Sequence, residues 1–103
     1  MRKPVQLSRE AREELLDAAG RYGAERAELK QQFLVAVDDA LERVARYASH
    51  LAAITRPNES PVVKRVLMAR FPYAVYFLEL PRTLRVIAVA HEKREPRYWL
   101  SRR

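Results

Sequence analysis

Residues 62–89, VVKRVLMARFPYAVYFLELPRTLRVIAV, decide the fold class of this chain. Short runs of β-branched and aromatic residues fill the stretch, and Phe71-Pro72 and Pro81-Arg82 separate them. Such runs favour strands, whereas proline is excluded from the interior of a sheet because it cannot donate to the hydrogen-bond ladder. Successive strands with short connections pair antiparallel. The stretch therefore predicts a meander of three antiparallel strands.

Helical periodicity replaces the strand pattern before residue 56. Ser8 is placed to cap a first helix, and Gly20 and Gly23 are predicted to end it and turn the chain. Residues 24–54 are predicted to form a longer second helix, because apolar side chains recur there at steps of three and four. These side chains are Leu34, Val37, Leu41, Val44, Ala48 and Leu51. The two segments predict a helical hairpin.

A possible short strand at Val5–Leu7 completes the predicted order of elements, which is β-α-α-β-β-β. A helical hairpin and a small sheet each have an apolar face, and each can bury that face against the other. The chain has 103 residues, which is the usual length of one domain. Residues 1–103 are therefore predicted to form a single α+β domain, with the helical hairpin packed on a small, mainly antiparallel sheet.

The composition excludes several kinds of chemistry and location. The chain has no cysteine, so a disulfide, a thiol nucleophile and a cysteine-ligated metal are impossible. No apolar run approaches the roughly 20 residues that span a bilayer, and no apolar segment of a secretory signal follows the basic start. Neither a glycine-rich phosphate loop nor a carboxylate pair at metal spacing is evident. We expect a cytoplasmic protein with no metal and no cofactor.

Positive charge is concentrated in the C-terminal half of the chain. Residues 1–55 contain nine lysines and arginines and nine acidic residues, whereas residues 56–103 contain eleven against four. The second half thus carries the whole formal net charge of +7. Such segregation predicts one face for a polyanion or an acidic partner. The alternative is that the basic excess only keeps the protein soluble.

The charged segment HEKREPRYW, residues 91–99, follows the last predicted strand directly. The strand is expected to carry the cations of this segment to the rim of the sheet. Within the strand, the alternation of side chains predicts one shared face for Arg85, Ile87, Val89 and His91. The alternative interpretations are a solvated rim, a structural histidine and a tryptophan that anchors the tail. The candidate target-binding residues are Arg70, His91, Lys93, Arg94, Arg97 and Trp99.

A metal-free ribonuclease would need a base for the 2′-hydroxyl, cations for the phosphate and an acid for the leaving oxygen. Lys64 and Arg65 point to opposite faces of a strand, so only one of them can serve a given site. The residues available for this chemistry are Arg65, Arg85, Lys93, Arg94 and Tyr98. No complete set of acid, base and phosphate-binding residues is evident on one face, so the nuclease is the second interpretation.

Three features together resemble a known family: the order of elements, the phrase VVKRVLMARFPYAVYFLEL and the closing IAVAHEKREPRYW. Arg70-Phe71-Pro72-Tyr73 at the entry to a strand is one signature. The closing segment supplies the other, through His91, Lys93, Arg94, Glu95, Pro96 and Trp99. The chain resembles the RelE/ParE superfamily of type II toxin–antitoxin toxins, and its ParE-like branch in particular. It departs from that pattern at Glu92, where relatives often carry glycine.

The resemblance implies a compact bacterial toxin that a cognate antitoxin holds inactive. ParE-like members poison DNA gyrase and do no chemistry themselves, whereas RelE-like members enter the ribosomal A site and cleave messenger RNA. The missing catalytic set favours the ParE-like activity. The RelE-like endonuclease and a basic adaptor without toxicity are the alternatives.

The toxin interpretations predict the same partners. The antitoxin is expected to supply an acidic, amphipathic segment that lies against the helical hairpin and the basic sheet edge. Operator DNA is expected to be bound only through the antitoxin, and no membrane is involved. The target is DNA gyrase, or the ribosome and its messenger RNA in the alternative.

Overall fold

The computed structural model describes residues 2–95 and 97–103. Pro96, named above in the closing motif, and Met1 lie outside the described residues. The elements are β1 (Val5–Leu7), α1 (Arg9–Glu25), α2 (Ala27–Tyr47), the short 3-10 helix η1 (Ala48–His50), β2 (Val63–Leu67), β3 (Tyr73–Glu79), β4 (Leu84–His91) and a second 3-10 helix, η2 (Tyr98–Arg102). The predicted α+β class and the order β-α-α-β-β-β are confirmed.

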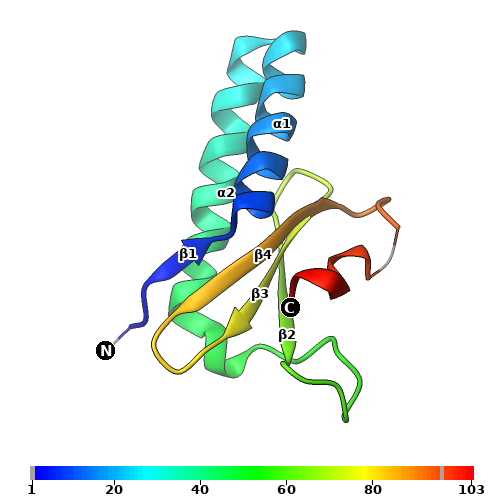
Figure 1. Ribbon diagram of the computed structural model, residues 1–103. Helices are drawn as coiled ribbons and strands as arrows, with labels where there is room; N and C mark the ends of the chain where they lie inside the picture. The colour runs from blue at the N-terminus through cyan, green and yellow to red at the C-terminus, as the bar shows by residue number, and fades with distance from the viewer. Residues whose placement is uncertain (1, 96) are drawn as a thin grey trace.

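The four strands form one sheet in the order β1-β4-β3-β2. β2, β3 and β4 pair antiparallel, as the meander predicts, and β1 lies parallel to β4 at one edge. The two long helices run antiparallel to each other and rise past the end of the sheet (Figure 1). No helix in the described ranges combines the length and the apolar character that crossing a bilayer requires.

The main core lies between the helical hairpin and one face of the sheet. Ser8 caps α1, because its Oγ accepts a hydrogen bond from the backbone N–H of Ala11 at 3.1 Å. Phe33 of α2 is fully buried, and its ring lies 5.2 Å from Phe71 and 5.3 Å from Tyr73, centroid to centroid. These aromatic contacts fix the helices against the end of the sheet where β3 begins and β4 finishes.

The opposite face of the sheet, the open face, is not covered by the helices. A smaller apolar cluster lies on it, and its buried members are Val63, Leu78, Ile87, Ala88 and Trp99. Trp99 belongs to η2, so the C-terminal segment packs on this face while the hairpin packs on the other. η2 leaves part of this face exposed, including Arg65 and Leu67.

The prediction that Gly20 and Gly23 end the first helix is wrong. α1 continues through both glycines to Glu25, and the chain reverses at Arg26, whose backbone is extended at φ −157°. A Cβ atom on Gly23 would lie 3.2 Å from Cδ of Lys30 in α2. Gly23 therefore serves the close approach of the two helices, which a glycine allows as readily as it allows a turn.

The predicted common face of Arg85, Ile87, Val89 and His91 is also wrong, because β4 contains a bulge. Tyr76 lies opposite Ala88 and Phe77 lies opposite Val86, so Ile87 is an extra residue in β4. An extra residue reverses the alternation beyond it. Ile87 accordingly packs on the open face, whereas Val89 packs in the main core.

Candidate target-binding groove

A shallow groove lies on the open face of the sheet beside η2. Two adjoining hollows of about 170 and 220 Å³ form it and share Arg65, Tyr76, Arg97 and Trp99. We call the following residues the basic groove: Arg65, Tyr76, His91, Arg94, Arg97, Tyr98 and Trp99. Glu92 and Glu95 also line one hollow, so the charge of the groove is mixed at one end.

Strand alternation places Arg65 in the groove and Lys64 outside it. Arg65 lies opposite Tyr76, which lies opposite Ala88 of the open-face cluster. Lys64 lies opposite Phe77 of the main core, so its side chain leaves the sheet on the helix side. Only Arg65 of this pair can therefore contact a ligand in the groove.

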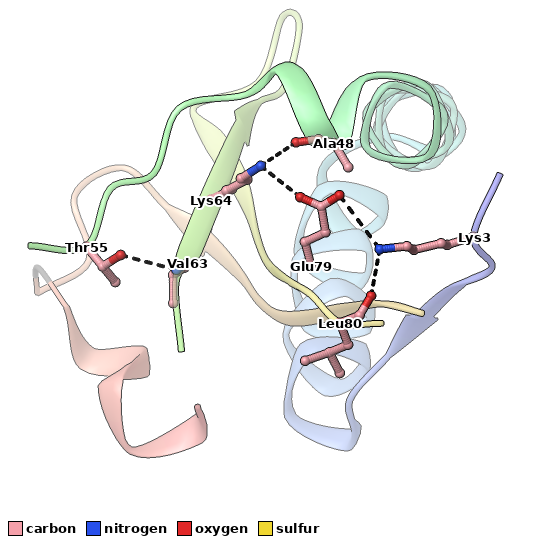
Figure 2. A network of polar contacts seen from close by, with 7 residues as sticks. All are labelled: Lys3, Ala48, Thr55, Val63, Lys64, Glu79 and Leu80. Carbon is pink, nitrogen blue, oxygen red and sulfur yellow. Dashed lines mark hydrogen bonds and ion pairs between the residues drawn. The ribbon is translucent and has the colours of Figure 1, made fainter. Parts of the chain in front are cut away.

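Lys64 belongs to a polar network that joins three parts of the fold (Figure 2). Its Nζ donates to the carbonyl of Ala48 at 2.7 Å and to Oε1 of Glu79 at 2.9 Å. Lys3 donates to the carbonyl of Leu80 at 2.7 Å and lies 3.8 Å from Oε2 of Glu79. The hydrogen bond from Lys64 is the main cause of a lowered pKa at Glu79. The network ties the end of α2 and the N-terminal segment to β2 and β3.

Two of the groove arginines are available to an anionic partner. Arg97 forms an ion pair with Glu59 at 2.5 Å, and its guanidinium lies 5.7 Å from the centre of the Trp99 ring. Arg65 and Arg94 are exposed, and no carboxylate of a described residue lies within ion-pair distance of either. Exposed, unpaired guanidiniums bind carboxylates and phosphates well, because their fork of donors matches these groups.

With this geometry in place, the chain can be compared with known proteins. No protein-family model matches it, and no curated protein sequence matches it either. A solved structure does match: a chain from the chromosomal ParDE toxin–antitoxin system of P. aeruginosa, with a TM-score of 0.71 and 17% sequence identity. The match covers 86% of this chain and 95% of that chain. The fold is ParDE-like.

The ParDE-like fold agrees with the resemblance to the ParE-like branch that the sequence indicates. It assembles only part of the predicted target-binding surface. Arg94 and Arg97 line the groove, but neither Arg70 nor Lys93 lies among the described residues that line it. Arg70 sits in the β2–β3 loop at φ 71°. This loop meets the end of β4 through the hydrogen bond from Glu92 N–H to the Pro72 carbonyl, so both cations lie at the same end of the sheet as the groove.

His91 and Trp99 occupy positions that limit what they can contact. Nδ1 of His91 accepts a hydrogen bond from the backbone N–H of Lys93 at 3.0 Å, and its ring lies 5.1 Å from the ring of Tyr73. Trp99 is only 2% exposed, so its indole lies mostly beneath the groove surface and anchors the C-terminal segment. Trp99 therefore lines the groove but exposes very little of its own surface to a target.

The five residues considered for a nuclease are divided by the ParDE-like fold. Arg65, Arg94 and Tyr98 line the groove, whereas Lys93 does not, and Arg85 lies near the start of β4, opposite Leu78 and beside β1. The hydroxyl of Tyr98 donates to Oε2 of Glu14 at 2.5 Å. Burial, together with this hydrogen bond, raises the pKa of Tyr98 strongly. Its proton is therefore held by Glu14 and is poorly placed for transfer to a substrate.

The raised pKa of Tyr98 predicts a loss of stability in alkali. An unfolded tyrosine ionises near pH 10, whereas folded Tyr98 must stay protonated to donate to Glu14. The stabilisation is fully present below about pH 10 and is lost as the pH rises toward the folded pKa. Glu14, Arg94 and Arg102 face this phenol. We expect the urea midpoint of the wild type to fall more steeply between pH 9.5 and 11 than that of Tyr98→Phe. Parallel curves would contradict the prediction.

Glu14, Glu59 and Tyr76 support the groove but were not predicted as site residues. Glu14 lies in α1 and reaches Tyr98 across the fold, and Glu59 reaches Arg97 from the loop before β2. No local sequence pattern signals such contacts between distant segments. Tyr76 has the sequence appearance of a core residue, and only the register of β2 with β3 places it beside Arg65. No three histidine or carboxylate side chains of the described residues gather closely enough to hold a metal ion.

Proposed function

We propose that this chain is a ParE-like toxin of a type II toxin–antitoxin system, which inhibits DNA gyrase and is neutralised by a cognate antitoxin. The observation that carries the proposal is the likeness in fold to a chain of a ParDE system over 95% of that chain. The closing HEKREPRYW segment supports the same branch. The proposal places the protein in the bacterial cytoplasm, where gyrase acts.

In this proposal the basic groove and its rim contact the target. Arg65 and Arg94 offer unpaired guanidiniums to anionic groups, and Arg70 and Lys93 add charge at the same end of the sheet. The antitoxin supplies an acidic, amphipathic segment that lies against the helical hairpin and the basic sheet edge. Such a segment orders as it binds and covers a large area. Operator DNA is then bound through the antitoxin alone.

The RelE-like alternative has less support from the geometry. Arg85 lies outside the groove, and the proton of Tyr98 is bound to Glu14. Cations for a phosphate are present, but Tyr98 is not free to transfer its proton, which leaves His91, whose Nδ1 already accepts from the backbone N–H of Lys93. A target that is bound without chemistry fits this arrangement better than a substrate that is cleaved.

The supercoiling activity of purified gyrase tests the proposal. We expect micromolar toxin to stop supercoiling and to trap cleaved DNA, and we expect its expression without antitoxin to arrest growth. The double variant Arg65→Glu with Arg94→Glu should weaken inhibition at least about tenfold, because opposed charges replace two guanidinium contacts. Arg82→Glu is the matched control, since Arg82 is exposed in the β3–β4 turn and lines neither hollow. It should inhibit like the wild type.

Three results would reject the gyrase proposal. Gyrase that is unaffected by micromolar toxin excludes gyrase as the target. New A-site ends on translated messages after induction, seen by primer extension, would establish the RelE-like endonuclease. Normal growth on expression without antitoxin would leave the basic adaptor as the remaining interpretation.

A further inference from the structure

The C-terminal segment η2 is joined to the rest of the protein by side chains. Its backbone hydrogen bonds, from Leu100 N–H to the Arg97 carbonyl and from Arg103 N–H to the Leu100 carbonyl, stay within the segment. Arg97, which precedes η2, has a left-handed backbone at φ 65°, an unfavourable conformation for a residue other than glycine. Segments held in this way can open locally while the rest of the fold persists.

Glu14 is the side chain on which most of the polar attachments of η2 meet, whereas Trp99 adds apolar packing in the open-face cluster. Its Oε2 accepts a hydrogen bond from the Tyr98 hydroxyl at 2.5 Å, and its Oε1 pairs with Nη1 of Arg102 at 2.9 Å. The carboxylate of Glu14 and the guanidinium of Arg102 are both largely shielded, with 16% and 18% of the side chain exposed. A shielded pair of this kind depends strongly on both partners being present.

The same two side chains also stand where a neighbouring strand would lie. β1 pairs only with Leu84–Val86, so the β4 edge from Ile87 onward has no strand beside it. There the N–H of Val89 donates to Glu14 at 3.0 Å, and the carbonyl of Ile87 accepts from Arg102 at 3.1 Å. A carboxylate replaces a backbone carbonyl, and a guanidinium replaces a backbone N–H. Two backbone groups of the free β4 edge are thereby satisfied by side chains.

Closure of η2 also builds one wall of the basic groove. The Arg94 guanidinium lies 4.0 Å from the centre of the Tyr98 ring, and the Arg102 guanidinium lies 4.9 Å from the centre of the same ring. Arg97, Tyr98 and Trp99 belong to the groove and move with the segment if it opens. The position of three groove residues therefore depends on contacts made by Glu14, which lies outside the groove.

We propose that Glu14 is a positioning residue for the basic groove: with Arg102 it fastens η2 along the free edge of β4, and the groove exists only while η2 is fastened. Release of η2 leaves the hairpin and the four-stranded sheet folded but removes the wall that carries Arg97, Tyr98 and Trp99. The role of this device in target binding rests on the proposed function, whereas the fastening itself does not.

Trp99 is the only tryptophan of the chain and is 2% exposed, so its fluorescence reports closure of η2. We expect Glu14→Ala to shift its emission to longer wavelength and to raise acrylamide quenching several-fold, while the far-ultraviolet circular dichroism stays close to that of the wild type. The emission and quenching of Glu14→Gln should lie between those of the wild type and of Glu14→Ala. An amide oxygen still accepts the hydrogen bonds, but it lacks the negative charge that pairs with Arg102. Glu13→Ala is the matched control, since Glu13 is exposed and pairs only with Arg9 among the described residues.

Hydrogen exchange of the wild type tests the same device without any substitution. The Val89 amide donates its hydrogen bond to Glu14. It should therefore exchange through a local opening, and faster than the amides of the β3–β4 ladder. A Glu14→Ala protein with Trp99 as shielded as in the wild type would overturn the proposal. So would exchange of Val89 only through global unfolding, because η2 would then be an inseparable part of the fold.

These measurements contain no target, so they are independent of the gyrase assay. A wild-type protein that leaves gyrase unaffected rejects the proposed function alone. A Glu14→Ala protein with an open η2 that inhibits the target as well as the wild type does would overturn the positioning role. Weakened inhibition by Glu14→Ala, with Glu13→Ala unchanged, supports it.

Discussion

Phe33→Ala is expected to lower the free energy of unfolding by about 3–5 kcal/mol, which is the range for removal of a buried aromatic side chain. Phe33 is 0% exposed, and its ring contacts those of Tyr22, Phe71 and Tyr73 with centroid distances of 5.2, 5.2 and 5.3 Å. Alanine removes the buried area, leaves a cavity and breaks three aromatic contacts at once. Because a domain of this size has a stability of roughly 5–15 kcal/mol, a large part of it depends on this one ring.

The measurement is urea unfolding followed by circular dichroism. Val35→Ala is the matched control, because Val35 lies in the same helix but is 58% exposed, and it should change stability by less than about 0.5 kcal/mol. Phe33→Leu, which keeps most of the volume, should cost less than Phe33→Ala. A loss below about 1 kcal/mol for Phe33→Ala would mean that the aromatic cluster does not hold the hairpin on the sheet.

The fold class could be predicted because it depends on periodicity. Apolar steps of three and four in residues 24–54 and runs of β-branched and aromatic residues in 62–89 predicted a helix and strands, although α2 itself ends at Tyr47. The order of the elements then leaves one simple way to pack them. The Ser8 cap was predictable for the same reason, since it is a local interaction with Ala11. The fold class and the helix cap can therefore be read from local residue chemistry and from the spacing of apolar side chains.

Features that depend on two distant segments could not be predicted. The bulge at Ile87 arises from the register of β3 against β4, and no residue in the run Val86–Val89 indicates it. Gly23 looked like a helix end because a glycine that permits close packing and a glycine that permits a turn are identical in sequence. Glu14 was missed because its partners, Tyr98 and Arg102, lie at the other end of the chain.

The candidate site was predictable in its chemistry but less so in its membership. The excess of arginine and lysine in residues 56–103 predicted a basic surface, and three arginines of that half, Arg65, Arg94 and Arg97, line the groove. Which cations line one groove depends on strand faces and on the closure of η2. Arg65 enters the groove because it faces away from the helices, and Arg85 lies outside it on the same open face because it is near the start of β4, whereas the groove is at the end of that strand.

Lys64→Met is expected to lower the free energy of unfolding by about 2–3 kcal/mol, because it removes the nearest donor from the Ala48 carbonyl and from the partly shielded Glu79 carboxylate. The side chain of Lys64 is 13% exposed and that of Glu79 is 27% exposed. Without Lys64, the Ala48 carbonyl at the end of α2 keeps the longer hydrogen bond from the Leu51 N–H, at 3.3 Å, and Glu79 keeps the more distant Lys3. This partial compensation places the expected cost below that of a fully buried pair.

Two comparisons make the Lys64 prediction specific to the ion pair. Arg65→Met is the matched control, because Arg65 is the next residue and is exposed on the other face of β2, so it should cost less than about 0.5 kcal/mol. The second is pH. The pKa of Glu79 is lowered chiefly by the hydrogen bond from Lys64, so the pair stabilises the fold above the unfolded pKa, near 4.5, and this stabilisation is lost as the pH falls toward the folded pKa. The difference between wild type and Lys64→Met should therefore shrink in acid, and a difference that is equally large at pH 7 and pH 3 would show that the methionine acts through packing and not through the loss of charge.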